Sequence, residues 1–265
     1  MASVEPQATN APVCPRHPNT VAYVRCQRCE RPTCPQCQVP APVGILCVDC
    51  VREANKAARP VRSRLGFVVA RGTPWATYGL IIANVAFFIL GPFLLGKNWS
   101  ADLGLWPDYG LAVEAVYPAA GDEWYRWITA GFVHFGFIHI AMNMFVLWQF
   151  GTQLEPALGR LRFLSLYIVG LLGSSLAVEL FGEAGSVHGG ASGAIFGLVA
   201  AYAVVLRSLR LPWVNMAVFA GVWLVLGFFT SSVSWQGHLG GAVAGAAMML
   251  IMLRGVQKRE RARQL

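Results

Sequence analysis

Charged residues are scarce in this sequence. They make up 13% of its 265 residues, whereas 55% of the residues are hydrophobic. Soluble globular domains carry roughly 25% charged residues, so an ordinary soluble fold is excluded for most of the chain. Several uncharged stretches are longer than the ~20 residues that a membrane-spanning helix needs. The shortage of charge therefore predicts an integral membrane protein that spans the lipid bilayer several times.

Cysteine is absent after Cys50, although seven cysteines lie between Cys14 and Cys50. An odd number counts against a complete disulfide framework. The first 65 residues also lack an apolar run that resembles the hydrophobic region of a secretory signal peptide. We therefore expect this N-terminal segment to stay in the cytoplasm, where its cysteines are reduced and available as metal ligands.

The apolar part of the chain divides into six segments of helix length. Residues 72–96 contain no charge, whereas residues 97–126 form a loop-like segment with several acids, glycines and prolines. The predicted fold class is an all-α membrane protein, in which a six-transmembrane-helix bundle over residues 72–254 follows a small two-zinc, cysteine-rich domain. The six helices are predicted at residues 72–96, 127–154, 163–178, 184–206, and on either side of the polar residues 230–237 within the run 211–253.

Basic residues determine the expected orientation in the membrane. Ten of the 21 lysines and arginines lie at or before Arg71, and five lie between Arg254 and Arg263. The turns after the second and fourth predicted helices are also basic, whereas the opposite loops carry mainly acids. By the positive-inside rule, both termini are expected in the cytoplasm. The net charge of +8 therefore indicates membrane topology and not a nucleic-acid partner.

Two basic segments flank the predicted membrane domain. Residues 54–71 are expected to form a juxtamembrane linker, which either lies along the anionic cytoplasmic leaflet or is a solvated run of charge. Residues 255–265 are expected to form a basic cytoplasmic tail. The cysteine-rich module is expected to cover residues 1–53.

Four pairs of metal-ligand residues follow one another in this module, and two residues separate the members of each pair. That spacing lets two side chains reach one tetrahedral Zn²⁺. Eight ligands serve two ions, and loops this short build no core of their own, so zinc would supply most of the folding energy. Disulfides, iron–sulfur ligation or a fortuitous cluster are the alternatives. The pairs are Cys14 and His17, Cys26 and Cys29, Cys34 and Cys37, and Cys47 and Cys50.

The spacing resembles a B-box-type zinc finger, in which the pairs interleave as a cross-brace. The resemblance implies that the first and third pairs hold one ion and that the second and fourth pairs hold the other. Sequential pairing is the alternative. Modules of this type usually bind proteins, so the resemblance also implies a cytoplasmic protein partner and a structural role for both zinc ions.

Polar groups inside lipid are costly, so each one is a candidate functional residue. Ser192 lies among small residues in GGASG, a setting that is also common in helix packing and at helix N-termini. His238 begins the last helix, and Gly241 and Gly245 lie on the same helical face, which permits close approach by a neighbour. A buried histidine needs a partner, and Ser192 is a suitable one. A core histidine bonded to a carbonyl is the alternative.

His139 and Asn143 are four residues apart on the second predicted helix. They therefore project from one face and can donate hydrogen bonds to one point, as an oxyanion hole requires. A metal site that includes His134 is the alternative. It is disfavoured because His134 and His139 are five residues apart and no intramembrane carboxylate or cysteine completes a coordination shell.

Together these motifs resemble the rhomboid protease family. The resemblance runs from about Trp75 to Leu253 and rests on GASG around Ser192, GHLGGAVAG around His238, HFGFIHIAMN over residues 134–143 and EWYR over residues 123–126. It implies a six-helix bundle with a water-filled cavity open to the outer face. In that cavity a serine–histidine dyad would hydrolyse a peptide bond in or near the transmembrane helix of another protein.

The resemblance also implies individual roles. Ser192 would be the nucleophile and His238 the general base, with no catalytic cofactor. The oxyanion would be stabilised by the Ser192 amide, His139 and Asn143, while His134, Trp124 and Arg126 support the first loop and the site. The family often has a tyrosine four residues after the nucleophile, where this chain has Phe196. Stacking on the histidine would survive that change without the hydroxyl.

Two other functions fit parts of the sequence. One is a non-catalytic membrane chaperone or adaptor of the rhomboid pseudoprotease type, which lacks the serine or the histidine that this chain retains. The other is a metal transporter, although the membrane segments contain no carboxylate pathway. The expected partners are transmembrane protein substrates and the lipid bilayer. The expected location is a bacterial plasma membrane.

Overall fold

The computed structural model describes residues 11–57, 62–63, 65–67, 72–107, 124–183, 185–229 and 234–262. The chain divides into two compact units, residues 1–60 and residues 61–265. The first contains the cysteine-rich segment, and the second contains the apolar helices.

The first unit consists of two small antiparallel hairpins and one helix. Strand β1 (Val13–Cys14) pairs with β2 (His17–Val21), and β3 (Gln38–Pro40) pairs with β4 (Ile45–Cys47). A short 3₁₀ turn, η1 (Pro35–Cys37), precedes β3. Helix α1 (Val48–Ala57) follows β4 and continues past residue 53, where the sequence places the end of the module. The two buried clusters of this unit consist mainly of cysteine side chains, so its interior is built around sulfur.

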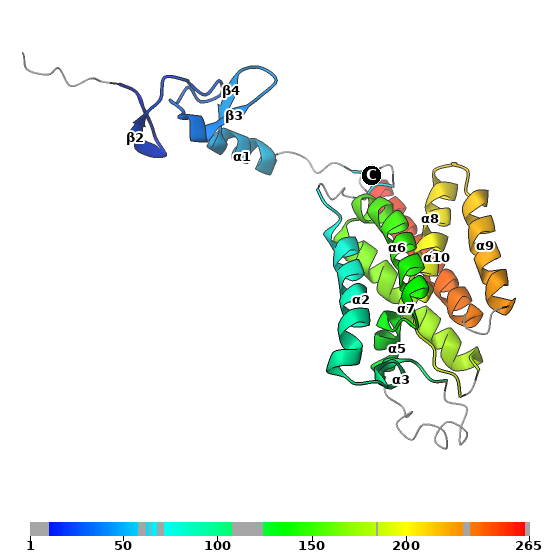
Figure 1. Ribbon diagram of the computed structural model, residues 1–265. Coiled ribbons are helices and arrows are strands. Elements are labelled where there is room, and N and C mark those ends of the chain that lie inside the picture. The colour runs from blue at the N-terminus through cyan, green and yellow to red at the C-terminus, as the bar shows by residue number, and fades with distance from the viewer. Residues whose placement is uncertain are drawn as a thin grey trace, which may run out of the picture. The chain divides into compact units, whose positions relative to one another are not determined.

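In the described part of the second unit, the named elements are all helices (Figure 1). Helices α2 and α3 precede residues 108–123, and the short α5 and η2 lead into α6. Three helices, α8 to α10, complete the chain. The bounds are α2 (Trp75–Leu94), α3 (Trp99–Leu103), α5 (Arg126–Thr129), η2 (Ala130–Phe132), α6 (Phe137–Leu158), α7 (Arg160–Phe181), α8 (Ser192–Ser208), α9 (Val214–Phe229) and α10 (Trp235–Arg261).

Three of these helices are long and apolar enough to cross a membrane, namely α2, α7 and residues Trp235–Lys258 of α10. A fourth span results if the bent pair of residues Arg126–Phe132 and helix α6 is counted as one. Helices α8 and α9 are apolar but shorter, with 17 and 16 residues. The described part of the chain therefore has three or four candidate spans, and the expected six stay a prediction.

Two predicted helices differ from the structure in their first residues. The second does not run unbroken from Trp127, because residues 133–136 separate η2 from α6 and the two parts meet at 97°. The fourth begins at Ser192 and not at residue 184. Residues 185–191 before it are not helical, and His188 forms an antiparallel bridge with Leu105 from the loop that follows α3. Both differences place polar residues at helix ends, where backbone amides are free to bind a ligand.

Glycines let helix α10 pack closely against α7 and α8. A Cβ atom at Gly241 would meet the backbone carbonyl of Gly193, and a Cβ atom at Gly245 would meet that of Gly197. Only backbones without intervening side chains approach so closely. The expected small-residue face after His238 is therefore the surface that holds α10 against the start of α8.

Part of the expected linker belongs to the core of the second unit. Leu65 and Phe67 are buried in its main hydrophobic cluster, and the guanidinium of Arg162 lies 5.1 Å from the centre of the Phe67 ring. Burial of these two apolar side chains holds this part of the chain against the first turn of helix α7.

Candidate active site and metal centres

The eight predicted metal ligands form two groups in the first unit. Within each group the ligand atoms all lie within 4.8 Å of one another, as four ligands of one ion require. This grouping is the interleaved one that the B-box resemblance implies, and not the sequential one. The groups are Cys14, His17, Cys34 and Cys37, and Cys26, Cys29, Cys47 and Cys50.

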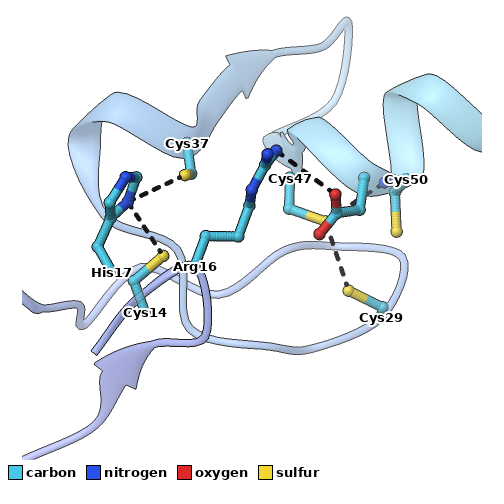
Figure 2. A network of polar contacts seen from close by, with 8 residues as sticks. Cys14, Arg16, His17, Cys29, Cys37, Cys47 and Cys50 are labelled. Atoms are coloured by element: carbon cyan, nitrogen blue, oxygen red, sulfur yellow. Dashed lines mark hydrogen bonds and ion pairs between the residues drawn. The ribbon is translucent and has the colours of Figure 1, made fainter.

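Distances within the groups fit a tetrahedral ion. His17 Nδ1 lies 3.2 Å from Cys34 Sγ and 3.4 Å from Cys37 Sγ, and Cys29 Sγ lies 3.7 Å from Cys47 Sγ. Ligands at the zinc bond lengths of about 2.0–2.3 Å are separated by roughly 3.5 Å in a tetrahedron. Figure 2 shows Arg16 between the two groups, where its guanidinium lies 3.5 Å from the Asp49 carboxylate.

The thiols of each group differ in acidity. A hydrogen bond from the backbone amide of Cys34 is the main cause that lowers the pKa of Cys14 to about 6, whereas burial raises the pKa of Cys37 to about 11. Burial likewise raises the pKa of Cys50 to about 12. Packed thiols cannot all ionise by themselves at pH 7, but a divalent cation stabilises several thiolates at once. The donor sets therefore fit a metal that accepts sulfur and nitrogen ligands.

In the second unit, the side chains of Ser192 and His238 are in direct contact. Ser192 is the first residue of α8, and His238 lies in the first turn of α10. His238 Nε2 lies 2.9 Å from Ser192 Oγ, which is a hydrogen-bond distance between a base and a nucleophile. His238 is only 7% exposed, so water does not compete freely for this contact.

Stacking and burial orient the His238 ring. The Phe196 ring lies parallel to it, with centroids 4.1 Å apart and an angle of 13° between the planes. The other ring nitrogen, Nδ1, is buried and has no hydrogen-bond partner within the described residues. Among the described residues, His238 therefore contacts Ser192 and no carboxylate, as in a serine–histidine pair.

His139 lies beside the nucleophile. A Cβ atom built on Gly190 would be 2.8 Å from His139 Nε2 and 3.6 Å from Ser192 Oγ, so both atoms face one small space. Gly190 has φ +127°, which only glycine adopts readily, and this conformation leaves the space open. The Ser192 amide is one of the unpaired donors at the start of α8. These groups can stabilise an oxyanion in that space.

The side chain of Asn143 forms a hydrogen bond within its own helix. Its amide nitrogen donates to the backbone carbonyl of His139, 2.8 Å away within helix α6, so one of its two N–H donors is already used. Its side chain is buried at 6% exposure. The second N–H remains for a ligand, and the first fixes the side chain against the turn that carries His139.

The three other residues expected to support the site lie at different places around it. His134 is buried in the break before α6, where its ring centroid lies 5.0 Å from that of His139. Arg126 is buried and donates to the carbonyls of Ala101 and Gly104, at 2.7 and 3.0 Å, which ties α5 to the α3 segment. Trp124 is 76% exposed. Glu123 of the EWYR motif lies outside the described residues.

Comparisons with known proteins agree with this arrangement. The family model of the rhomboid domain matches residues 121–255, which is just over half of the chain. The chain belongs to the rhomboid family. It is an integral membrane protein of that family, and the rhomboid match begins well after the two cysteine groups. Both Ser192 and His238 lie within the matched residues.

Three rhomboid relatives illustrate the similarity. The rhomboid protease GluP of Bacillus subtilis (strain 168) is 33% identical over 184 residues, which cover 67% of this chain and 35% of GluP. YdcA of the same organism is 34% identical over 59% of this chain and 79% of YdcA. The rhomboid protease GlpG of Serratia proteamaculans (strain 568) is 33% identical over 47% of this chain and 46% of GlpG. The chain thus spans less than half the length of GluP and GlpG.

One buried residue of the rhomboid unit was not predicted from the sequence. Glu155, near the end of α6, is 1% exposed and accepts hydrogen bonds from the amides of Ala76 and Thr77 and from the Thr77 hydroxyl, at 2.8–3.0 Å. Helix α2 follows Pro74, which makes no side-chain cap. A carboxylate 78 residues away therefore caps α2, and a carboxylate is favoured there by the helix dipole.

Proposed function

We propose that this protein is an intramembrane serine protease, with Ser192 as nucleophile and His238 as general base. The observation that carries the proposal is the 2.9 Å contact between Ser192 Oγ and His238 Nε2 at the starts of two apolar helices. Its substrates would be transmembrane proteins, cleaved in or near their membrane helices. A non-catalytic chaperone would have no use for a buried serine–histidine pair held beside oxyanion donors.

The geometry supports a mechanism for the first half of the reaction. His238 Nε2 accepts the proton of Ser192 Oγ as that oxygen attacks the carbonyl carbon of the scissile peptide bond. The negative charge that develops on the carbonyl oxygen is stabilised by the Ser192 amide and by His139, with the free N–H of Asn143 as a further donor. His238 then protonates the leaving amine, and an acyl group remains on Ser192.

The membrane arrangement follows from the charges and the helix lengths. We place both termini in the cytoplasm of a bacterial cell, with the protein in its plasma membrane, because the basic flanks and the basic turns then face inward. In this arrangement α8 and α9 are two short spans, which brings the number of crossings to six. A shorter span is accommodated by local bilayer thinning at modest cost.

The two cysteine groups would each hold one Zn²⁺. All eight ligands are protein side chains, which leaves no open position on either ion, so the metal would supply folding energy and no chemistry. The first unit would then serve as a cytoplasmic module that binds a protein. Removal of the metal should unfold this unit, because its interior contains little besides the ligands.

The test is peptide hydrolysis by the full-length protein in lipid vesicles, with a panel of helix-destabilised transmembrane substrates. The native protein should cleave at least one substrate, and Ser192→Ala should cleave none. The matched control is Ser165→Ala, because Ser165 is a serine of α7 whose hydroxyl bonds to its own helix. Cleavage by folded Ser192→Ala at the native rate would refute the proposal.

A further inference from the structure

A small cavity lies against the Ser192–His238 pair. Its volume is about 30 Å³, and its walls include both of these residues. A water molecule needs a cavity of about 10–15 Å³ by this measure, so there is room for one or two waters. Four further polar side chains line the cavity, namely Ser174, Ser175, His188 and Ser234. A polar cavity of this size is suited to ordered water.

His188 is held rigidly at this cavity. Its backbone amide donates to the carbonyl of Leu105 and its carbonyl accepts from the amide of Leu105, both at 2.8 Å. The backbone carbonyl of Glu183 lies near its ring. The ring nitrogen Nε2 is buried and has no hydrogen-bond partner within the described residues. In the neutral tautomer that carries its proton on Nδ1, Nε2 has an unshared electron pair and can accept a hydrogen bond.

Ser174 is another polar residue in the wall of the cavity. Its hydroxyl oxygen would collide with a Cβ atom at Gly193 and would lie 2.8 Å from one at Gly237. These glycines adjoin Ser192 and His238 in the sequence. The hydroxyl is thus packed between the starts of the two helices that carry the pair. It can accept or donate a hydrogen bond to a water held in the cavity.

We propose that His188 positions the water that hydrolyses the acyl-enzyme, with Ser174 as a second contact of the same water. The inference rests on the proposed function, because it concerns the second half of that reaction. His188 is a positioning residue in this account. It holds the water through its Nε2 and does not itself remove a proton.

The step is balanced within the site. After the amine has left, His238 Nε2 is unprotonated again and can accept a proton. The water donates one hydrogen to His188 Nε2 in a hydrogen bond and the other to His238 Nε2, and its oxygen attacks the carbonyl carbon of the ester. The bond from that carbon to Ser192 Oγ breaks, and the proton on His238 passes to Oγ. One water is consumed, and a carboxylic acid and free Ser192 are formed.

The experiment separates acylation from deacylation in the full-length protein. The probe is a p-nitrophenyl ester of an acylated tetrapeptide, which releases p-nitrophenolate in a burst on acylation and then at the rate of deacylation. His188→Leu should keep the burst rate within about threefold and should lower the steady-state rate by about 10- to 100-fold, as misplacement of a reacting group does. His188→Gln, which retains an acceptor, should recover part of that loss.

Two further measurements guard against a purely structural effect. Hydroxylamine, a nucleophile that diffuses in without a fixed site, should restore turnover of His188→Leu to near the native rate. Ser174→Ala should lower deacylation in the same sense by a smaller factor, whereas Val187→Ala in the same loop should not. If His188→Leu does not fold, Ser174→Ala and its hydroxylamine response decide the question.

The outcomes distinguish this inference from the proposed function. No burst and no Ser192 acylation in the native protein would refute the proposed function. A normal native burst, combined with equal steady-state rates in the native protein and His188→Leu, would overturn only the role of His188. Equal losses in burst and steady state, without rescue by hydroxylamine, would also overturn it, because they indicate a structural role.

Discussion

Gly190→Ala tests the geometry of the oxyanion space most specifically. The added methyl would lie 2.8 Å from His139 Nε2, whereas ordinary van der Waals contacts of a Cβ atom begin at 3.4 Å. The imidazole would therefore have to move by at least about 0.6 Å. The methyl would also lie 3.6 Å from Ser192 Oγ, which is ordinary contact, so the nucleophile would not be displaced directly.

Two effects of different size follow. At φ +127° an alanine costs about 1–3 kcal/mol in backbone strain, so the free energy of unfolding should fall by that amount. Displacement of one oxyanion donor lowers the rate of acylation by about 10²–10³-fold. The variant should therefore fold, bind a fluorophosphonate probe, and react with it about 10²-fold more slowly than the native protein.

The control is Gly185→Ala, in the same loop. Gly185 also has a positive φ, +78°, but a Cβ atom there would meet nothing within 4 Å. Its variant should lose stability through backbone strain and should react with the probe within about threefold of the native rate. Thermal unfolding and the labelling rate are measured on both variants. A native labelling rate in Gly190→Ala, or an equal loss in Gly185→Ala, would refute the reasoning.

Three further predictions concern stability and metal. Glu155→Ala should lower the free energy of unfolding by about 3 kcal/mol, because it leaves the amide and hydroxyl of Thr77 without an acceptor. Thermal unfolding of the full chain in detergent measures this loss, and an unchanged midpoint would contradict the cap. Gly241→Ala should cost about 1–3 kcal/mol by overpacking α10 against α8, and a neutral result in the same measurement would contradict the close packing. Elemental analysis should find two zinc ions per chain, and Cys37→Ser should leave one ion. Chelation should unfold residues 11–57, which faster hydrogen exchange of their backbone amides would show. A native count of one zinc ion or none would count against the two groups.

The helices were predictable from the sequence where a long uncharged run decides the structure. Residues 72–96 contain α2, and the polar stretch 230–237 begins directly after α9 ends at Phe229, although its last three residues already belong to α10. Hydrophobicity alone could not locate the start of α8, since the glycines before Ser192 are neither charged nor strongly polar. That start depends on the bridge between Leu105 and His188, which joins distant parts of the chain.

The candidate site was partly predictable for a related reason. Intramembrane polar residues are rare, so Ser192 and His238 could be paired by composition, and the structure places their side chains 2.9 Å apart. Their catalytic role stays a prediction. The spacing of four residues predicted that Asn143 and His139 share one face of a helix. It did not predict that the Asn143 side chain donates a hydrogen bond to the helix backbone. Glu155 resembled an ordinary charge at a helix end, because its partners lie on another helix.

The most direct test of the account is the site at which a fluorophosphonate reacts with the folded, full-length protein. The account predicts one labelled residue, Ser192, identified by mass spectrometry of proteolytic fragments. Labelling should be lost in Ser192→Ala and slowed by about 10²–10⁴-fold in His238→Ala, the usual contribution of a general base. Labelling at any other serine, or undiminished labelling in folded Ser192→Ala, would contradict the central claim.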